Sequence, residues 1–477
     1  MTRTLIRGGT VLSLDPAVGD LPQGDVLVEG TVVRDVAPSI DTHADRVIDA
    51  RGAIVMPGLI NAHIHTWETA LRGLGNDWAG SDYFNFFHAK LAPLFTPQDT
   101  YIATLMGALA QMDAGVTGVL DWCHNNATPA HTDAAIEALF DSGIRAVFGH
   151  GTVKAHPKPG EKHFSEVPHP LDEIRRLRAG RLSSDDALVT LAVAILGPDY
   201  STLEVSRQDF RAAREFGLLS TAHVWGRPNR LVAGGYRTIA AEGLLGPDHN
   251  LVHANYFEDD ELKIVVDSGA SVTSTTAGEM NNHVRISLSR RVRDFGGQPS
   301  IGTDSEVATK GDMFDAMRSA LRMQRLYANI DTVRNAESAQ DSAAADFVRK
   351  NLKTVGTGGS PIQQVAVKTR EVLEWATVNN ARALRWDRHV GRLAPGLQAD
   401  LIVVRRDGLH IASAQDPVQA VVSYAQSSDV DTVMVAGRVV KEAGRLNFPM
   451  LGSRVAELRA SGERLLAAAR DASAAHA

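Results

Sequence analysis

The fold is decided by the stretch Pro57-Gly-Leu-Ile-Asn-Ala-His-Ile-His65, an apolar run that ends in two histidines. Side chains two residues apart in a β-strand point to the same side, so the imidazoles of His63 and His65 can converge on one ion at the carboxyl end of such a strand. An isolated His-x-His pair is more often structural than functional. Its meaning therefore depends on what the rest of the chain places beside it.

The apolar run belongs to a repeating pattern that extends from about Ile60 to Asp304. A short apolar run, a polar loop, an amphipathic helix and a glycine follow one another, which is typical of βαβ units around a parallel sheet. The apolar runs cover residues 59–65, 116–122, 144–149, 188–196, 218–224, 250–255, 270–275 and 299–304. Eight parallel strands that alternate with helices predict an α/β fold, a (β/α)8 barrel of the TIM type.

Local signals support particular elements. Thr96 and Pro97 supply a helix N-cap followed by proline, and Gly115 ends the apolar periodicity that starts there, so we expect a helix between them. A second helix is expected around residues 313–321, where apolar residues share one face. The polar stretch 331–361 predicts an insertion or a mobile loop.

The two ends of the chain differ from this middle. Residues 1–56 and 396–450 contain short alternating apolar runs divided by glycine and proline. These two segments predict one small β-sandwich domain assembled from both chain ends. The barrel then occupies residues 57–395, and residues 451–477 are expected to form a C-terminal helix that docks onto the body.

Composition narrows the function classes. The 477 residues include 17 histidines and a single cysteine, Cys123, which excludes a disulfide framework and a thiolate zinc site. A net charge of −7 and the lack of basic runs argue against nucleic acid as a partner. The first residues lack the apolar run typical of a signal peptide, and no stretch of ~18 consecutive apolar residues occurs, so we expect neither a signal peptide nor a membrane-spanning segment. We expect a cytoplasmic protein with a small-molecule substrate and no membrane partner.

Further metal-ligating residues end other predicted strands. His223 ends the fifth strand, His253 the sixth and Asp304 the eighth. Active sites of barrel enzymes are built at this rim. Imidazoles and a carboxylate around an open mouth suit a catalytic Zn²⁺ or Fe²⁺, which would lower the pKa of its water from 15.7 towards ~7. Asp304 is then placed to accept the proton of the water, and His253 to hydrogen-bond the oxyanion that forms.

Aromatic residues also adjoin the predicted strand ends, namely Trp67, Trp122 and Trp225. Two interpretations are open for them, a wall for a flat heterocyclic substrate or a cap on the barrel core. His124 and His150 end the second and third rim segments and are further candidates for contact with substrate.

Several short motifs follow one another over nearly the whole chain. They are the stretch 57–65, Leu71-Arg-Gly, Ala114-Gly-Val-Thr, Thr221-Ala-His, Leu251-Val-His-Ala, Ile301-Gly-Thr-Asp-Ser, Gly311-Asp-Met-Phe and Gly391-Arg-Leu-Ala-Pro-Gly-Leu-Gln-Ala-Asp. In this order they resemble the amidohydrolase superfamily. Within it, the chain is similar to the cytosine-deaminase-like branch, which includes S-adenosylhomocysteine deaminases, guanine deaminase and the atrazine and triazine hydrolases.

The resemblance implies a single metal ion, zinc in preference to iron, whose ligands are His63, His65, His223 and Asp304. It implies His253 as the histidine that contacts the water or the substrate. Relatives with two metal ions place a carboxylated lysine at the end of the fourth strand, where this chain has Ile195-Leu-Gly-Pro-Asp without lysine. Relatives are often dimers, so a homo-oligomer, most simply a dimer, is expected.

The chain departs from the family where a proton-relay acid is expected. Deaminases of this branch carry glutamate three residues after the fifth-strand histidine, and that position here is Gly226, which cannot relay a proton. Acids on neighbouring rim loops are candidates for the role, although such acids are more often solvated or structural. They are Glu68, Asp199, Glu279 and Glu306. The full set of candidate substrate-binding residues is Trp67, Glu68, Trp122, Asp199, Trp225 and Glu306.

We therefore expect a metal-dependent hydrolase that cleaves a C–N bond of a nitrogen-containing cyclic compound, by deamination or by amide or amidine hydrolysis. His253 and Asp304 are the expected catalytic residues. Gly226 leaves two alternatives open. A substrate with a good leaving group would need no acid, as in hydrolytic dechlorination or dealkylamination of a triazine. A metal-bound paralogue that binds its ligand without turnover would also discard the acid.

Overall fold

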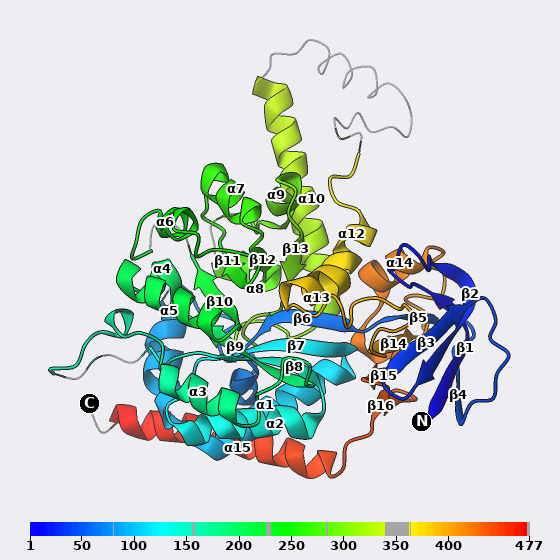
Figure 1. The fold of residues 1–477 in the computed structure, drawn as a ribbon, viewed down its shortest axis with the longest axis horizontal. Coiled ribbons are helices and arrows are strands. Elements are labelled where there is room, and N and C mark those ends of the chain that lie inside the picture. The colour runs from blue at the N-terminus through cyan, green and yellow to red at the C-terminus, as the bar shows by residue number, and fades with distance from the viewer. Residues whose placement is uncertain are drawn as a thin grey trace.

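The computed structural model describes residues 1–79, 81–154, 157, 159–225, 230–282, 285–338, 362 and 364–474. A barrel and a smaller sheet beside it make up the body of the molecule (Figure 1). Among these residues, no helix is both long enough and apolar enough to cross a membrane.

Eight parallel strands form the barrel. Their bounds are β6 Leu59–Ile64, β7 Val116–Cys123, β8 Arg145–His150, β9 Val189–Ala194, β10 Leu219–Val224, β11 His249–His253, β12 Ser271–Ser274 and β13 Pro299–Ile301. Each strand pairs in parallel with the next one along the chain. The strands fall on the eight apolar runs of the sequence, so the predicted barrel is confirmed.

The barrel closes where its first strand meets its last. The backbone N–H groups of Thr303 and Asp304 both donate to the carbonyl oxygen of His63, at N···O distances of 3.1 and 3.0 Å. Gly302 permits this approach, because a Cβ atom at that position would lie 2.7 Å from the same oxygen. Closure therefore places Asp304 directly beside the two histidines at the end of β6.

Helices alternate with the strands on the outside of the barrel. Those between strands are α1 Pro97–Asp113, α2 Pro129–Ser142, α3 Leu171–Ala179, α4 Gly197–Tyr200, α5 Leu203–Glu215, α6 Gly235–Ala241, α7 Asp259–Asp267, α8 Thr276–Asn282 and α9 Ser289–Asp294. After β13 follow α10 Met313–Ser338, α12 Thr369–Glu374, α13 Asn380–Ala383, α14 Pro417–Gln419 and α15 Leu451–Ala474. Two helical segments over the barrel mouth, η1 Thr66–Leu71 and η2 Tyr83–Leu91, follow β6.

Helix α1 begins as its sequence predicts. The Thr96 hydroxyl oxygen accepts a hydrogen bond from the Asp99 backbone N–H at 3.3 Å, and the Asp99 carboxylate accepts one from the Thr96 N–H at 2.8 Å. This reciprocal capping box satisfies N–H groups that have no partner within the helix. Gly115 follows the helix with φ of +86°, a left-handed conformation that favours glycine.

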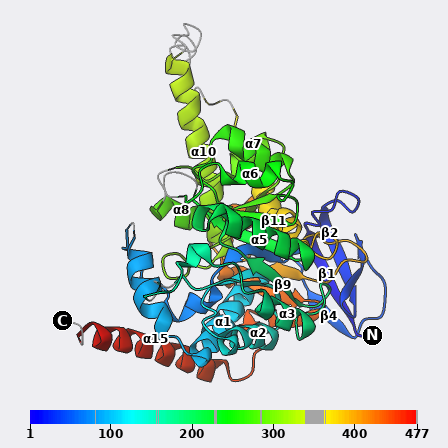
Figure 2. The same ribbon diagram turned by 60° about the vertical axis from the view of Figure 1, so that its left-hand side comes forward.

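Helix α10 runs further than its sequence predicts. The expected loop over residues 331–361 is wrong for residues 331–338, which continue the helix, whereas residues 339–361 lie outside the described part of the chain. The helix is anchored by its buried start, and Arg290 donates to the Asp331 carboxylate at 2.8 Å near its end. Figure 2 shows α10 projecting away from the barrel.

The smaller sheet combines both ends of the chain. Its strands are β1 Arg3–Val11, β2 Leu21–Glu29, β3 Val32–Ala37, β4 Arg46–Asp49, β5 Ile54–Pro57, β14 Leu401–Val404, β15 Val430–Val435, β16 Arg438–Glu442 and β17 Arg445–Leu446. The two ends meet where β14 pairs antiparallel with β5, and β1 pairs in parallel with β4 and then β5 along its length. Figure 1 shows the blue and orange strands side by side. The predicted domain limits stay predictions.

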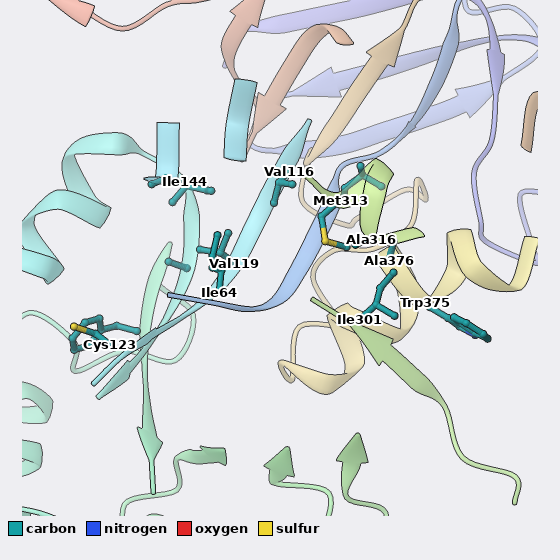
Figure 3. Packing of buried hydrophobic residues seen from close by; sticks show 14 of the residues in the cluster. Ile64, Val116, Val119, Cys123, Ile144, Ile301, Met313, Ala316, Trp375 and Ala376 are labelled. Atoms are coloured by element: carbon teal, nitrogen blue, oxygen red, sulfur yellow. The ribbon is translucent and has the colours of Figure 1, made fainter. Parts of the chain in front are cut away.

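The small sheet has a hydrophobic cluster of its own, but several of its residues, among them Ile402, Val404 and Val433, belong to the cluster of the barrel. The sheet buries Ile6, Val26, Val55 and Val403 in one cluster. The barrel cluster packs strand residues against the surrounding helices, and Figure 3 shows part of it, with Val116, Val119 and Cys123 of β7, Ile301 of β13 and Met313 of α10. Full burial of such side chains stabilises the fold by ~1.5–3 kcal/mol each. The strand ends that carry the site are therefore held rigidly.

The C-terminal helix α15 lies along the outside of the barrel, as Figures 1 and 2 show. Leu465 is fully buried, and Ser461 donates to the Asp99 carboxylate of α1 at 2.7 Å. Arg464 also donates to Asp99. The helix thus docks onto α1 through an apolar contact and a charge-assisted one.

A buried ion pair joins the barrel to the small sheet. Arg145, the first residue of β8, donates from Nε and Nη2 to the two Asp400 carboxylate oxygens at 2.8 and 3.1 Å. The Ala436 N–H adds a third hydrogen bond to that carboxylate at 2.7 Å. Both charged side chains are less than a tenth exposed. Removal of one partner therefore leaves the other charge without compensation.

Arg145→Met should lower the free energy of unfolding by about 3–5 kcal/mol, because the buried Asp400 carboxylate loses its counter-charge. Urea denaturation followed by circular dichroism measures the change. Arg207→Met is the matched control, since the pair of Arg207 with Glu242 lies on the surface and should contribute less than about 1 kcal/mol. Equal losses in the two variants would contradict the role of the buried pair.

Candidate active site

Five side chains converge at the carboxyl ends of the barrel strands. His63 is on β6 and His65 directly follows it, His223 is on β10, His253 ends β11, and Asp304 follows β13. Nε2 of His63 lies 3.2 Å from Nε2 of His223 and 3.2 Å from Oδ1 of Asp304. Nε2 of His65 lies 3.4 Å from the same oxygen. The rim thus gathers residues that are up to 241 positions apart in the sequence.

The spacing of these donor atoms fits a tetrahedral metal ion. Zinc binds imidazole nitrogen at about 2.0–2.1 Å, and two donors at tetrahedral angles are then about 3.3 Å apart. The three separations of 3.2, 3.2 and 3.4 Å match that edge. Atoms of His63, His223, His253 and Asp304 also lie within 4.8 Å of one another. The residues present therefore fit a single divalent metal ion.

Hydrogen bonds orient two of the imidazoles. Nδ1 of His65 lies 2.7 Å from the carbonyl oxygen of Trp122, which can only accept, so Nδ1 carries the hydrogen and Nε2 keeps its lone pair for a metal. Nδ1 of His253 faces the Thr275 hydroxyl at 3.1 Å and the Glu279 carboxylate at 3.4 Å. Nε2 of His253 then points toward Oδ2 of Asp304, 3.9 Å away.

Electrostatics keep three of the four proposed ligands in the protonation states that metal binding needs. At the fourth, His65, burial lowers the pKa, but the hydrogen bond to Asp304 and the charge of Glu68 outweigh it and raise that pKa. Burial lowers the pKa of His63 to about 3 and holds the pKa of His223 well below its usual range, so both imidazoles are neutral. Burial alone would raise the pKa of Asp304, but hydrogen bonds to His63 and His65 hold it well below the usual range. Neutral imidazoles and an ionised carboxylate are the forms that bind metal.

Backbone strain marks the same place. His253, Ala254 and Asp304 have φ of +73°, +57° and +66°, in the left-handed region that residues with a Cβ atom rarely adopt. Such conformations cost of order 1–3 kcal/mol each and cluster at functional sites. Two of the three strained residues are those expected to be catalytic.

The side chains of His63, His65, His223, His253 and Asp304 are called the metal cluster below. A cavity of about 870 Å³, a volume that includes its open mouth, lies over them. Residues of the metal cluster line it on one side, and aromatic side chains form part of its walls. The aromatic lining residues are Trp78, Tyr83, Phe84, Tyr200 and Trp225. The cavity therefore suits a flat ring system placed over the metal cluster.

Of the tryptophans considered for substrate contact, only Trp225 lines this cavity. Trp67 is fully buried beneath it, where its Nε1–H donates to Nδ1 of His124 at 3.1 Å. Trp122 is buried against His223, with ring centres 3.9 Å apart. Trp122 turns into the barrel, whereas Trp67 packs against Phe87 and Phe95 of the segments that follow β6. His124 lines the cavity, whereas His150 does not and pairs with His169 instead.

None of the four candidate acids lines the cavity directly. Asp199 accepts from the Trp225 N–H at 2.8 Å, and Glu306 accepts from Thr69 and pairs with Arg72. Glu279 accepts from Asn255 and faces His253. These three acids position other residues. Gly226, where the family has its acid, lies outside the described residues.

Glu68 is the acid that connects to the cavity through hydrogen bonds. It accepts from the Tyr83 hydroxyl at 2.5 Å and from the Ser305 hydroxyl, and both of these residues line the cavity. Burial raises the pKa of Glu68 to about 7, and burial also raises the pKa of Tyr83 well above its usual range. Glu68 can therefore hold a proton near neutral pH one hydrogen bond away from the cavity.

Sequence reasoning missed Tyr83, Tyr200 and Lys154, all of which line the cavity. Tyr83 and Tyr200 follow the first and fourth strands, so a search of every rim loop for aromatic residues would have found them. Lys154 lies four residues after β8 ends at His150. Its position close behind a strand end was the available signal.

The chain belongs to the amidohydrolase family, whose model matches residues 54–440. A 5'-deoxyadenosine deaminase from Methanosarcina mazei is 24% identical over 472 residues, which cover 98% of this chain and 99% of the relative. An adenosine deaminase from Xanthomonas campestris, solved with bound zinc, has a TM-score of 0.78 at 19% identity and covers 98% of this chain and 99% of its own. An atrazine chlorohydrolase from Arthrobacter aurescens, solved with zinc, has a TM-score of 0.76 at 21% identity, with 96% and 100% covered.

His223→Ala should lower the zinc content of the purified protein from about one equivalent to well below one, because a tetrahedral site loses a ligand. Inductively coupled plasma mass spectrometry after dialysis measures the content. His150→Ala is the matched control, since His150 ends another barrel strand, β8, but lies outside the cluster. A wild-type protein that takes up no zinc on reconstitution would exclude the centre.

Proposed function

We propose that the protein is a hydrolase with one divalent metal ion, zinc in preference to iron, bound by His63, His65, His223 and Asp304. It acts on an exocyclic C–N bond of a nitrogen heterocycle with a ring amidine. The observation that carries the proposal is the tetrahedral spacing of donor atoms on one side of a cavity with aromatic walls. The deaminase named among the relatives supports an adenine-type ring. A dimeric assembly and a cytoplasmic location stay predictions from the sequence.

When bound, the metal ion supplies Lewis acidity and an activated water at neutral pH. Oδ2 of Asp304 faces His253 and the Thr275 hydroxyl, whereas Oδ1 faces His63 and His65. Oδ2 is therefore the atom that takes up the proton of the attacking water. His253, oriented by Thr275 and Glu279, lies where it can hydrogen-bond the oxygen that adds to the ring carbon.

The leaving amine needs a proton, and Glu68 is the acid best placed to supply it. In the structure the Tyr83 hydroxyl donates to the Glu68 carboxylate. When Glu68 is protonated this hydrogen bond reverses, so that Tyr83 gives its hydroxyl proton to the amine and takes one from the Glu68 carboxyl group. Ser305 offers a parallel route from the other carboxyl oxygen. This relay replaces the acid that relatives carry at the position of Gly226. The aromatic walls position the planar ring of the substrate and exclude water from the site of proton transfer.

A second candidate is hydrolysis of a carbon–chlorine bond in a triazine. The atrazine chlorohydrolase among the structural neighbours supports it, and chloride needs no proton to depart. This candidate requires neither Glu68 nor Tyr83 for the chemical step. A binding protein without turnover is the third reading, and it would require no proton acceptor at Asp304.

The zinc-loaded protein should release ammonia from a panel of aminopurines, aminopterins, aminopyrimidines and aminotriazines, measured by a coupled glutamate dehydrogenase assay. Asp304→Asn should abolish release from any substrate found, by about 100-fold or more, because the proton acceptor is lost. Chloride release from chlorotriazines without ammonia release would support the second candidate. Tight binding without any product would support the binding protein.

Glu68→Gln should lower kcat by about 100-fold or more and flatten its pH dependence. Burial raises the pKa of Glu68 to about 7, so the carboxyl group holds its proton below that pH and loses it above. The kcat of the unaltered enzyme should therefore fall as pH rises through about 7, and the variant should lack this fall.

Comparison variants are Asp199→Asn, Glu279→Gln and Glu306→Gln. If kcat is nearly unchanged in the variants of all four acids, the relay is contradicted and a substrate with a good leaving group is favoured. A loss confined to Glu279→Gln would instead assign the decisive role to the orientation of His253.

A further inference from the structure

Lys154 places a positive charge in the cavity without a matching negative one. Its ammonium nitrogen lies 4.3 Å from the ring centre of Tyr200 and 5.9 Å from that of Phe84. Among the described residues, no carboxylate forms an ion pair with it. Burial lowers the pKa of Lys154 to about 8, so the side chain is still charged at neutral pH. Contacts with aromatic faces compensate part of the desolvation of a cation, but a negative partner compensates more.

His124, on the same wall, offers a hydrogen-bond donor. Its Nδ1 accepts from the Trp67 indole N–H at 3.1 Å, and an indole can only donate. Nδ1 therefore carries no hydrogen, and in the neutral ring the hydrogen is on Nε2. The nitrogen of His124 left for a ligand is thus a donor.

His88 adds a third polar group to this wall. Its Nε2 is buried and has no hydrogen-bond partner among the described residues. Its ring lies against that of His124, with ring centres 4.6 Å apart. A buried polar nitrogen without a partner costs free energy that a ligand can recover. His88, His124 and Lys154 all line the cavity.

The negative charge of the cavity lies elsewhere. Asp304 is the one carboxylate among the described lining residues, and it belongs to the metal cluster. The wall formed by His88, His124 and Lys154 therefore attracts an acceptor. The Glu68 carboxyl group, which has an oxygen within 4.8 Å of a His124 nitrogen, does not line the cavity and already accepts hydrogen bonds from Tyr83 and Ser305. A second metal ion is disfavoured there, because Nδ1 of His124 is already hydrogen-bonded and the ammonium group repels cations.

We propose that Lys154, with His124 and His88, binds an anionic oxygen group of the substrate, a carboxylate or a phosphate. The inference rests on the proposed function in one respect, since it assumes that the ring of the same substrate lies over the metal cluster. The substrate class is then a flat nitrogen heterocycle that carries an acidic substituent. Lys154 determines specificity and takes no part in the bond cleavage.

The test measures binding of paired probes that lack a leaving amine, so that no turnover interferes. Orotate and uracil differ only in a carboxylate, and inosine 5'-monophosphate and inosine only in a phosphate. Titration calorimetry on the zinc-loaded protein at pH 6.5 gives the ratio of Kd values within each pair. We expect the anionic member of at least one pair to bind about tenfold more tightly, as a charge-assisted hydrogen bond allows.

Variants assign that preference to Lys154. In Lys154→Met the ratio of Kd values between the neutral and the anionic probe should fall close to one, although the variant keeps an apolar side chain against Tyr200. Lys154→Arg should retain most of the preference for the anionic probe. Lys90→Met is the matched control, because Lys90 also lies over an aromatic ring, that of Phe86, but outside the cavity. Thermal unfolding of each variant confirms that it is folded.

Two results would overturn the proposal. In the first, the Lys154→Met variant still binds the anionic probe more tightly than the neutral one. The metal ion, and not Lys154, would then bind the anionic group. The other is the lack of any preference in both pairs, whether or not the neutral probes bind. Failure of the hydrolase proposal is separate, because it would appear as an absence of product in the release assay and would leave these binding ratios measurable.

Discussion

The site depends on the hydrogen bonds that close the barrel between its first and last strands. His63 accepts two backbone N–H groups through one carbonyl oxygen, and the second of these belongs to Asp304. The same contact that completes the sheet thus brings a carboxylate to within 3.2 Å of one imidazole and 3.4 Å of another. A side chain at position 302 would prevent it, since its Cβ atom would overlap His63. Fold closure and assembly of the metal cluster are therefore one event.

The surrounding structure restrains the cluster rather than adding donors to it. The Trp122 carbonyl oxygen orients His65, and Thr275 and Glu279 orient His253. Burial keeps His63 neutral by lowering its pKa. Left-handed backbone at His253 and Asp304 is tolerated because the packed barrel holds it. The cavity above has different walls, with Glu68 behind Tyr83 on one loop and Lys154 on another.

Much of this could be predicted from the sequence, because strand periodicity and the rule for barrel rims are properties of short segments. His63, His65, His223, His253 and Asp304 each end an apolar run, and parallel strands of a barrel bring such ends together. The N-cap of α1 was equally local. The length of α10 could not be predicted from a short segment. Residues 331–338 lack an apolar face and continue a helix that is anchored by other residues.

The residues that line the cavity above the metal cluster could not be predicted, because the direction of side chains after the strand ends depends on tertiary packing. Trp67 and Trp122 adjoin strand ends as Trp225 does, yet Trp122 turns into the barrel and Trp67 is buried against Phe87 and Phe95. Lys154 and Tyr83 reach the cavity from segments after strand ends that carry no periodic signal.

The position of the metal ion is measured by anomalous diffraction at the zinc edge from zinc-loaded crystals. We expect one peak, about 2.0–2.2 Å from donor atoms of His63, His65, His223 and Asp304. A peak among His65, Glu68 and His124, whose donor atoms also lie within 4.8 Å of one another, would contradict this expectation.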